Sequence, residues 1–248
     1  MPTSRLVSET FAPLVDLIYP PRCPLCGDAL AAQKGLCFPC WETLSIPGEP
    51  ACNRCQRPFA DDEAVSGLTC APCLAHPPKH DGIAAGTLYN DTARKLVLNF
   101  KHGRKIALAP MLARLIAARL PRLEGDWLAV PVPLHRFRLW RRGFNQSALL
   151  AREISKLSGT HLLVDGLVRP RATPALGGLG KVERAKTLKG AITAHSRHRE
   201  ALKGANVLLV DDVLTSGATS NACVSVLKQA GAQKVVIACF SRVLDEAL

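Results

Sequence analysis

The chain has 248 residues, of which 21% are charged and only 5% are aromatic, and its formal net charge at pH 7 is +12. This length accommodates one large domain and one small domain, and an aromatic-poor, aliphatic-rich composition is typical of an α/β core. No run of about 18 apolar residues is present, which excludes a predicted membrane span. Residues 1–80 hold 6 Lys/Arg and 8 Asp/Glu, whereas residues 81–248 hold 26 and 12. The second part therefore suits a phosphorylated substrate or a nucleic-acid backbone.

Residues 1–22 are predicted to contain a short amphipathic helix between positions 6 and 18. Its apolar face consists of Val7, Phe11, Leu14, Val15 and Ile18. We expect this helix to pack against protein rather than bind a membrane. Glu9 and Asp16 interrupt the apolar stretch, so it does not match a secretory signal. The sequence thus predicts a cytoplasmic protein.

Eight of the ten cysteines form four Cys-x-x-Cys pairs within residues 23–78, where we place a separate module. The pairs are Cys23/Cys26, Cys37/Cys40, Cys52/Cys55 and Cys70/Cys73. Two such pairs can hold one metal ion in a tetrahedral site of four cysteine sulfurs, which leaves no open position for catalysis. Because a reducing compartment disfavours disulfides, the repeat predicts a double zinc ribbon with two structural zinc ions. An iron–sulfur or redox centre and disulfides are the alternatives. Sequential pairing is simpler, and interleaved pairing stays open.

Strands and helices are predicted to alternate through residues 79–248, which we treat as the larger domain. After a linker at 75–79, we expect strands at 82–89, 127–132, 162–164, 207–210 and 235–240, and helices at 91–100, 106–120, 146–157 and 220–230. This alternation favours a mostly parallel sheet. Residues 170–190 contain several prolines and glycines and carry few signals of regular structure.

Two basic clusters lie in this larger domain. One is Lys101–Lys105, and the other is Arg136–Gln146, which follows the strand predicted at 127–132. Lysine and arginine side chains can neutralise a diphosphate group, although a solvated basic loop is the alternative. Phe137, Trp140 and Phe144 interleave with the arginines. Such aromatic residues suit either core packing or stacking of single-stranded bases.

Residues 207–219 combine a predicted strand with a candidate anion site. Four apolar residues precede Asp211 and Asp212, which we expect to end the strand. The turn that follows consists of Thr215, Ser216, Gly217, Ala218 and Thr219. It offers backbone N–H groups at the start of a helix, where a phosphate monoester binds favourably. Ionised carboxylates only accept hydrogen bonds, and the vicinal hydroxyls of a ribose are suitable donors.

Other kinds of site also place paired acids after a strand. A Walker B strand requires a partner loop G-x-x-x-x-G-K-[ST]; Gly180-Lys181 comes closest, but Val182 follows it and Ala175 occupies the first glycine position. A receiver-type phosphoacceptor pocket places its acids early in a domain, whereas only residues 213–248 follow this pair. Two solvated acids at a strand end are the remaining alternative.

The pattern Val-Asp-Asp-Val-x-Thr-Ser-Gly-x-Thr at 210–219 resembles the phosphoribosyl diphosphate (PRPP) binding motif of type I phosphoribosyltransferases. Together with the cysteine repeat, Pro131-Val132-Pro133 and Arg141–Gln146, it makes the whole chain similar to the ComF/GntX group of bacterial proteins. The resemblance implies an α/β fold with a mostly parallel sheet of the type I phosphoribosyltransferase kind and a small N-terminal zinc-ribbon module. The chain departs from the group at Ala175 and Thr187, where Gln and Asn are usual.

The resemblance also implies roles for particular residues. Asp211 and Asp212 would bind the ribose hydroxyls and stabilise positive charge on the sugar, and Thr215–Thr219 would surround the 5-phosphate. Mg²⁺ would accompany PRPP. The diphosphate would lie among Lys101, Arg104, Arg141 and Arg142. Residues 170–190 would form a lid that excludes water.

The expected function is transfer of the phosphoribosyl group of PRPP to an unidentified acceptor, with release of diphosphate. The group that the chain resembles is linked to DNA uptake in natural transformation. The alternative is a non-catalytic module that senses a nucleotide, or that binds single-stranded DNA or a DNA-uptake protein.

Overall fold

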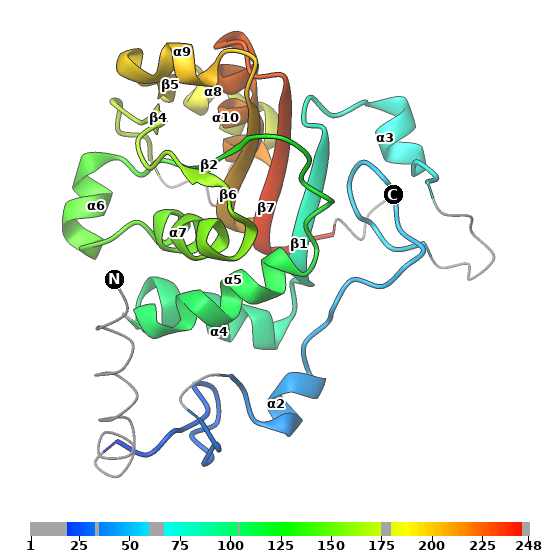
Figure 1. Ribbon diagram of the computed structural model, residues 1–248, viewed down its shortest axis with the longest axis vertical. Coiled ribbons are helices and arrows are strands. Elements are labelled where there is room, and N and C mark those ends of the chain that lie inside the picture. Colours follow the sequence, from blue (N-terminus) through cyan, green and yellow to red (C-terminus); the bar gives the residue numbers. More distant parts are fainter. Residues whose placement is uncertain (1–18, 33–34, 60–66, 104, 175–179, 245–248) are drawn as a thin grey trace.

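The computed structural model describes residues 19–32, 35–59, 67–103, 105–174 and 180–244 (Figure 1). The helix predicted at 6–18 lies outside these residues. Within them, no helix has both the length and the apolar character needed to cross a lipid bilayer.

The centre of the molecule is a five-stranded sheet in the order β1-β7-β6-β2-β3. Its strands are β1 (Gly82–Leu88), β7 (Lys234–Arg242), β6 (Asn206–Leu214), β2 (Trp127–Pro131) and β3 (His161–Leu162). Every neighbouring pair is parallel, which confirms the predicted sheet type. All carboxyl ends of the strands therefore lie at one edge of the sheet, where open α/β sheets bind ligands.

Helices cover both faces of this sheet (Figure 1). On one face lie α4 (Asp91–Lys101), α5 (Ala109–Ala117) and α7 (Gln146–Ser158), and their apolar residues share a buried core with Leu208 and Phe240 of the sheet. On the other face, α10 (Ala218–Gln229) contributes Val224 and Leu227 to a second core. Beyond α10 lie α8 (Lys181–Leu188), α9 (Arg199–Leu202) and an antiparallel pair, β4 (Leu167–Val168) with β5 (Thr193–Ala194).

A side-chain cap in one case and a proline in the other explain where two of the predicted helices begin. The side chain of Asn90 accepts a hydrogen bond from the Ala93 N–H at 2.9 Å and starts α4. The helix predicted at 106–120 is instead a 3₁₀ turn, η1 (Ile106–Leu108), followed by α5. Pro110 lies in the first turn of α5, a position that needs no intrahelical N–H donor.

Among the described residues, five α-helices were not predicted: α2 (Phe38–Glu42), α3 (Ala71–Ala75), α6 (Arg136–Arg142), α8 and α9. One of these helices is α6, in which no residue is buried. It ends at Gly143, which has a φ of 84°. Apolar periodicity cannot reveal a short helix without a buried face, although a left-handed glycine is a common helix stop. Another of these helices, α8, lies within residues 170–190 and packs against α10.

The expectation that the acid pair ends its strand was wrong. The strand β6 continues through both acids, because Val213 and Leu214 pair with Ser241 and Arg242 of β7. Asp211 and Asp212 are consequently buried at the carboxyl end of a paired strand rather than exposed in the turn.

The cysteine-rich segment contacts the larger domain in several places, including the Leu88 N–H, which donates to the carbonyl of Ser45 at 2.7 Å. Gln56 covers the edge of the sheet, since its Oε1 accepts a hydrogen bond from the Ala85 N–H of β1 at 2.9 Å. Its Nε2 donates to the carbonyl of Arg119 at 3.4 Å. Near the other cysteine group, the side chain of Asn99 donates to the carbonyl of Pro24 at 3.1 Å. The segment thus protects an edge strand that would otherwise be free to pair.

Candidate functional site

The candidate site lies at the carboxyl edge of β6, where Asp212 meets the end of α4. The ammonium nitrogen of Lys101 is 2.8 Å from Asp212 Oδ2, and the side chains are 23% and 5% exposed, respectively. Lys101 therefore neutralises a carboxylate that has little access to solvent. Sequence analysis placed both residues in one site, and the structure brings them together.

Asp211 has a different environment from its neighbour. Its Oδ1 accepts a hydrogen bond from the hydroxyl of Ser147, in the first turn of α7, at 3.1 Å. Burial raises the pKa of Asp211 to about 7, and the charge of Asp212 adds to this effect while Lys101 and the hydrogen bonds oppose it. Burial thus favours the protonated form of Asp211 more strongly than that of an exposed aspartate. Sequence analysis missed Ser147, whose only signal is its place after the helix cap Asn145.

The predicted arginines have separate positions. Arg142 is partly buried and donates to Gln146 Oε1 at 2.5 Å, while burial lowers its pKa and the carboxylate of Asp212 opposes that shift. Arg142 therefore belongs to the surroundings of the acid pair. Arg141 is exposed at the end of α6. Arg104 lies outside the described residues.

The turn after β6 leads directly into α10. Gly217 is the cap residue of this helix and has a φ of 72°, a left-handed conformation that glycine adopts without steric cost. Its carbonyl accepts from the Asn221 N–H at 2.7 Å. Since glycine has no side chain to cap the helix, the first N–H groups of α10 remain suited to an oxyanion. Thr215 is exposed, and Ser216 and Thr219 are partly exposed beside these groups.

The eight cysteines form two groups in sequential order. In each group, all four sulfur atoms lie within 4.8 Å of one another: Cys23, Cys26, Cys37 and Cys40, then Cys52, Cys55, Cys70 and Cys73. Cys26 and Cys37 are separated by 3.4 Å between sulfurs, and Cys55 and Cys70 by 3.6 Å. A zinc ion with four Zn–S bonds of about 2.3 Å requires sulfur separations of roughly 3.8 Å. Both groups fit one zinc ion each, and the interleaved pairing is not what the structure forms.

In each cysteine group, the pKa of one thiol is lowered from its ordinary value. Burial raises the pKa of Cys52, but backbone N–H groups of Cys70, Cys55 and Arg54 outweigh it and bring the pKa to about 6. Burial likewise raises the pKa of Cys23, and backbone N–H groups again outweigh it and bring the pKa to about 6. Thiolates are the metal-binding form of cysteine, so this backbone arrangement favours zinc.

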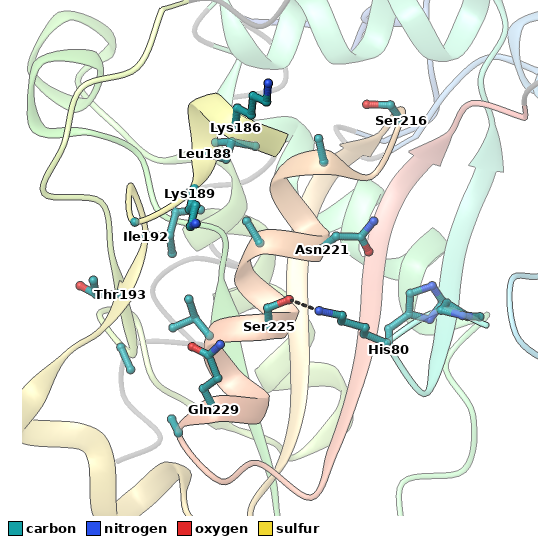
Figure 2. Close-up of a pocket in the computed structure, with 18 of the residues that line it drawn as sticks. His80, Lys186, Leu188, Lys189, Ile192, Thr193, Ser216, Asn221, Ser225 and Gln229 are labelled. Atoms are coloured by element: carbon teal, nitrogen blue, oxygen red, sulfur yellow. Dashed lines mark hydrogen bonds between the residues drawn. The ribbon is translucent and has the colours of Figure 1, made fainter. Parts of the chain in front are cut away.

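A large groove lies apart from the acid pair, on the outer side of α10 (Figure 2). Its volume is about 1310 Å³, and Ser216 and Ala218 of the turn belong to its lining. Asn221, Ser225 and Gln229 project from α10 toward it, and Lys79 reaches the hydroxyl of Ser225 at 3.4 Å (Figure 2). Its charged lining residues are Lys79, Lys186, Lys189, Arg199, Lys203 and Glu200. The groove is therefore strongly basic.

Two family models match the chain. A double zinc ribbon domain matches residues 14–74, and a phosphoribosyl transferase domain matches residues 151–247. The first match covers both cysteine groups, and the second covers β6, the turn and α10. The fold and the cysteine groups thus define a phosphoribosyltransferase-type α/β protein with an N-terminal double zinc ribbon.

Several curated relatives match most of the chain. Competence protein F of Haemophilus influenzae is 30% identical over 224 residues, which cover 87% of this chain and 94% of the relative. DNA utilization protein YhgH of Escherichia coli K12 is 30% identical over 226 residues, covering 85% and 98%. Competence protein ComFC of Streptococcus pneumoniae is 23% identical over 234 residues, covering 86% and 96%. The chain belongs to the ComF family, as its motifs indicated.

Proposed function

We propose that the protein binds PRPP at the carboxyl end of β6 and transfers its phosphoribosyl group to an acceptor, with release of diphosphate. The observation that carries this proposal is a run of three features between the end of β6 and the start of α10. They are the buried acid pair, Gly217 in a left-handed conformation, and a helix start without a side-chain cap. This run gives one ligand two kinds of contact. The turn supplies N–H and hydroxyl donors, and β6 supplies acceptors.

The 5-phosphate of PRPP would occupy the turn Thr215–Thr219. N–H groups at a helix start and the helix dipole both favour a phosphate there, the dipole by about 0.3–1 kcal/mol. The ribose hydroxyls would donate to Asp211 and Asp212. As the bond to diphosphate breaks, these carboxylates would stabilise the positive charge on the sugar ring.

The diphosphate would lie toward Lys101 and Arg142, with Arg141 and Arg104 as further candidates. Lys101 holds Asp212 at 2.8 Å, so the ion pair keeps this carboxylate in place where PRPP would bind. Mg²⁺ would bind with PRPP near the carboxylates, whose oxygen ligands it prefers, and would offset the diphosphate charge.

Diphosphate release tests the transfer. The protein is incubated with PRPP, Mg²⁺ and a panel of nucleobases and small carboxylate or phosphate acceptors, and diphosphate is measured with time. We expect release to depend on one class of acceptor and to be lost in Asp212→Asn. Asp126→Asn, at an exposed position before β2, serves as the matched control. Equal release from wild type and Asp212→Asn would contradict the proposal.

The exposed aromatic residues of α6 support a second candidate function, binding of single-stranded DNA. Phe137 is 64% exposed and Trp140 is 85% exposed, so neither packs in the core. Exposed rings beside arginines are suited to stacking unpaired bases, and the basic groove along α10 offers a path for a phosphate backbone. The names of the relatives, which refer to competence and DNA utilization, agree with this candidate.

Salt-dependent DNA binding tests the second candidate. The affinity for a labelled oligonucleotide should fall steeply as salt increases, and Trp140→Ala combined with Arg141→Ala should weaken it. Phosphoribosyl transfer and DNA binding can coexist, because the two proposals share only Arg141 and the turn residues Ser216 and Ala218, whereas the acid pair belongs to the first alone. An affinity that does not change with salt, or that is the same in the double variant, would contradict DNA binding through α6.

A further inference from the structure

Arg169, directly after β4, is a buried cation that has no acidic partner in the part of the chain that the structure describes. The residue is only 7% exposed, and its Nε forms no hydrogen bond. Its Nη2 donates to the hydroxyl of Thr173. Burial lowers the pKa of Arg169 and the charge of Arg138 lowers it further, while the thiol of Cys223 is the opposing influence. Of the described residues, no carboxylate is among the groups that shift the pKa of this guanidinium.

Arg138 of α6 converges on the same place. Its Nη2 donates to the carbonyls of Thr173 and Pro174, at 3.1 and 3.2 Å. Both arginines therefore contact Thr173: Arg138 donates to its carbonyl, and Arg169 donates to its hydroxyl. Among the described residues, no carboxylate forms an ion pair with Arg138 or Arg169.

Two guanidinium groups held close together repel, and a buried charge without a counter-charge is costly. Arginine forks match the geometry of a carboxylate or phosphate, which would remove both costs at once. A fold that keeps this pair together is consequently suited to an oxyanion ligand.

The pair is connected to the acid pair through α6. Arg138 and Arg142 are four residues apart and share one face of this helix. Arg142 lies within the electrostatic reach of both Asp212 and Arg138. A row of arginines therefore leads from the acid pair to Arg169, past the groups already assigned to the diphosphate.

We propose that Arg138 and Arg169 bind an oxyanion of the acceptor, so that the phosphoribosyl group passes to a molecule carrying a carboxylate or phosphate. This inference rests on the proposed function, because it presumes that PRPP occupies the turn and the acid pair. The competing source of the oxyanion is the diphosphate of PRPP itself, and the experiment separates the two.

The probe is inorganic phosphate, whose binding to the full-length, zinc-loaded protein is measured by phosphorus NMR and by the thermal shift that a ligand of the folded state produces. We expect Arg169→Gln and Arg138→Gln each to weaken phosphate binding by at least about tenfold, the effect of losing a hydrogen bond to a charged group. Arg152→Gln, at an exposed position of α7, should leave it unchanged. Saturating PRPP and Mg²⁺ should leave this phosphate site available in the wild type.

Zinc content and thermal unfolding identify any variant that does not fold, and Arg169→Lys provides a second test because it keeps the charge but loses the fork. Equal phosphate affinity in wild type and both glutamine variants would overturn the site. Displacement of phosphate by PRPP, together with weaker PRPP binding in Arg169→Gln, would overturn the assignment to the acceptor in favour of the diphosphate. If PRPP does not bind at all while phosphate binding still depends on Arg169, phosphoribosyl transfer fails and the acceptor assignment fails with it, whereas the oxyanion site stands.

Discussion

The ammonium group of Lys101 lies 2.8 Å from Oδ2 of Asp212, and this ion pair joins the end of α4 to the carboxyl end of β6. The carboxylate is buried deeply and the ammonium only in part. Helix and strand come from segments more than 100 residues apart, so the contact depends on the tertiary fold. The pair links the stability of the fold to the proposed ligand site.

Replacing Lys101 by Met should destabilise the protein, because Asp212 would remain buried without its partner. We expect a loss of about 1–3 kcal/mol in the free energy of unfolding, as for other buried polar groups deprived of a partner. Denaturant titrations at pH 7.5 measure this loss. Lys95→Met, at an exposed position of the same helix, should change the free energy little. Equal stability of the two variants would show that the ion pair contributes nothing.

Asp211→Asn should alter how stability depends on pH. The folded-state pKa of Asp211 is raised to about 7, above the value of about 4 expected in the unfolded chain. The folded state therefore keeps a proton that the unfolded state loses, and this contribution disappears as pH rises from about 4 to 7. Within that window the wild type should lose stability relative to Asp211→Asn as pH rises, on the order of 1 kcal/mol per pH unit. Unfolding curves of the two proteins at pH 5.5, 6.5 and 7.5 measure the difference, and parallel pH profiles would contradict it.

Each cysteine group should hold one zinc ion independently. Cys26→Ser and Cys55→Ser remove one sulfur from the first and second groups, so each variant should contain one zinc ion per chain in place of two. Cys223→Ala is the matched control, since Cys223 is buried in α10 and belongs to neither group. Metal analysis of the purified proteins gives the count. Unchanged zinc in either serine variant would contradict the sequential grouping.

The side chain of Gln56 should protect the edge of β1, because it links the segment that holds the second cysteine group to this strand. Its φ of 53° is left-handed, so the local backbone does not favour a glutamine, and the side chain is retained through its contacts with Ala85 and Arg119. Gln56→Ala would leave the Ala85 N–H without its acceptor, at a cost of about 1–3 kcal/mol. Hydrogen exchange at Ala85 should become faster, whereas Gln233→Ala, at an exposed position, should have no such effect. Unchanged exchange would show that the edge is protected by other contacts.

Sequence reasoning succeeded where the signal is contiguous. The strand β1, the helix α7 and the turn after β6 each carry their pattern within a few residues, and each was predicted close to its observed position. The same holds for the cysteine pairs, whose spacing alone indicates a zinc ribbon. The sequential grouping was the simpler expectation, but only the positions of the sulfur atoms decide it.

Sequence reasoning failed where structure depends on distant contacts. The order of strands places β1 beside β7, at opposite ends of the larger domain, and no local pattern specifies such a pair. Ser147 contacts Asp211 across 64 positions, and Arg169 meets Arg138 only because β4 and α6 come together in space. β6 continues past its acids because of pairing with β7, which cannot be seen in the strand itself.

Calorimetric titration of the protein with PRPP and Mg²⁺ tests the central claim most directly. The account predicts binding to the wild type and to Asp126→Asn, and at least about tenfold weaker binding to Asp212→Asn, which loses a charged acceptor for the ribose. Binding of equal strength to Asp212→Asn, or no binding to the wild type, would contradict the claim that the end of β6 holds this sugar phosphate.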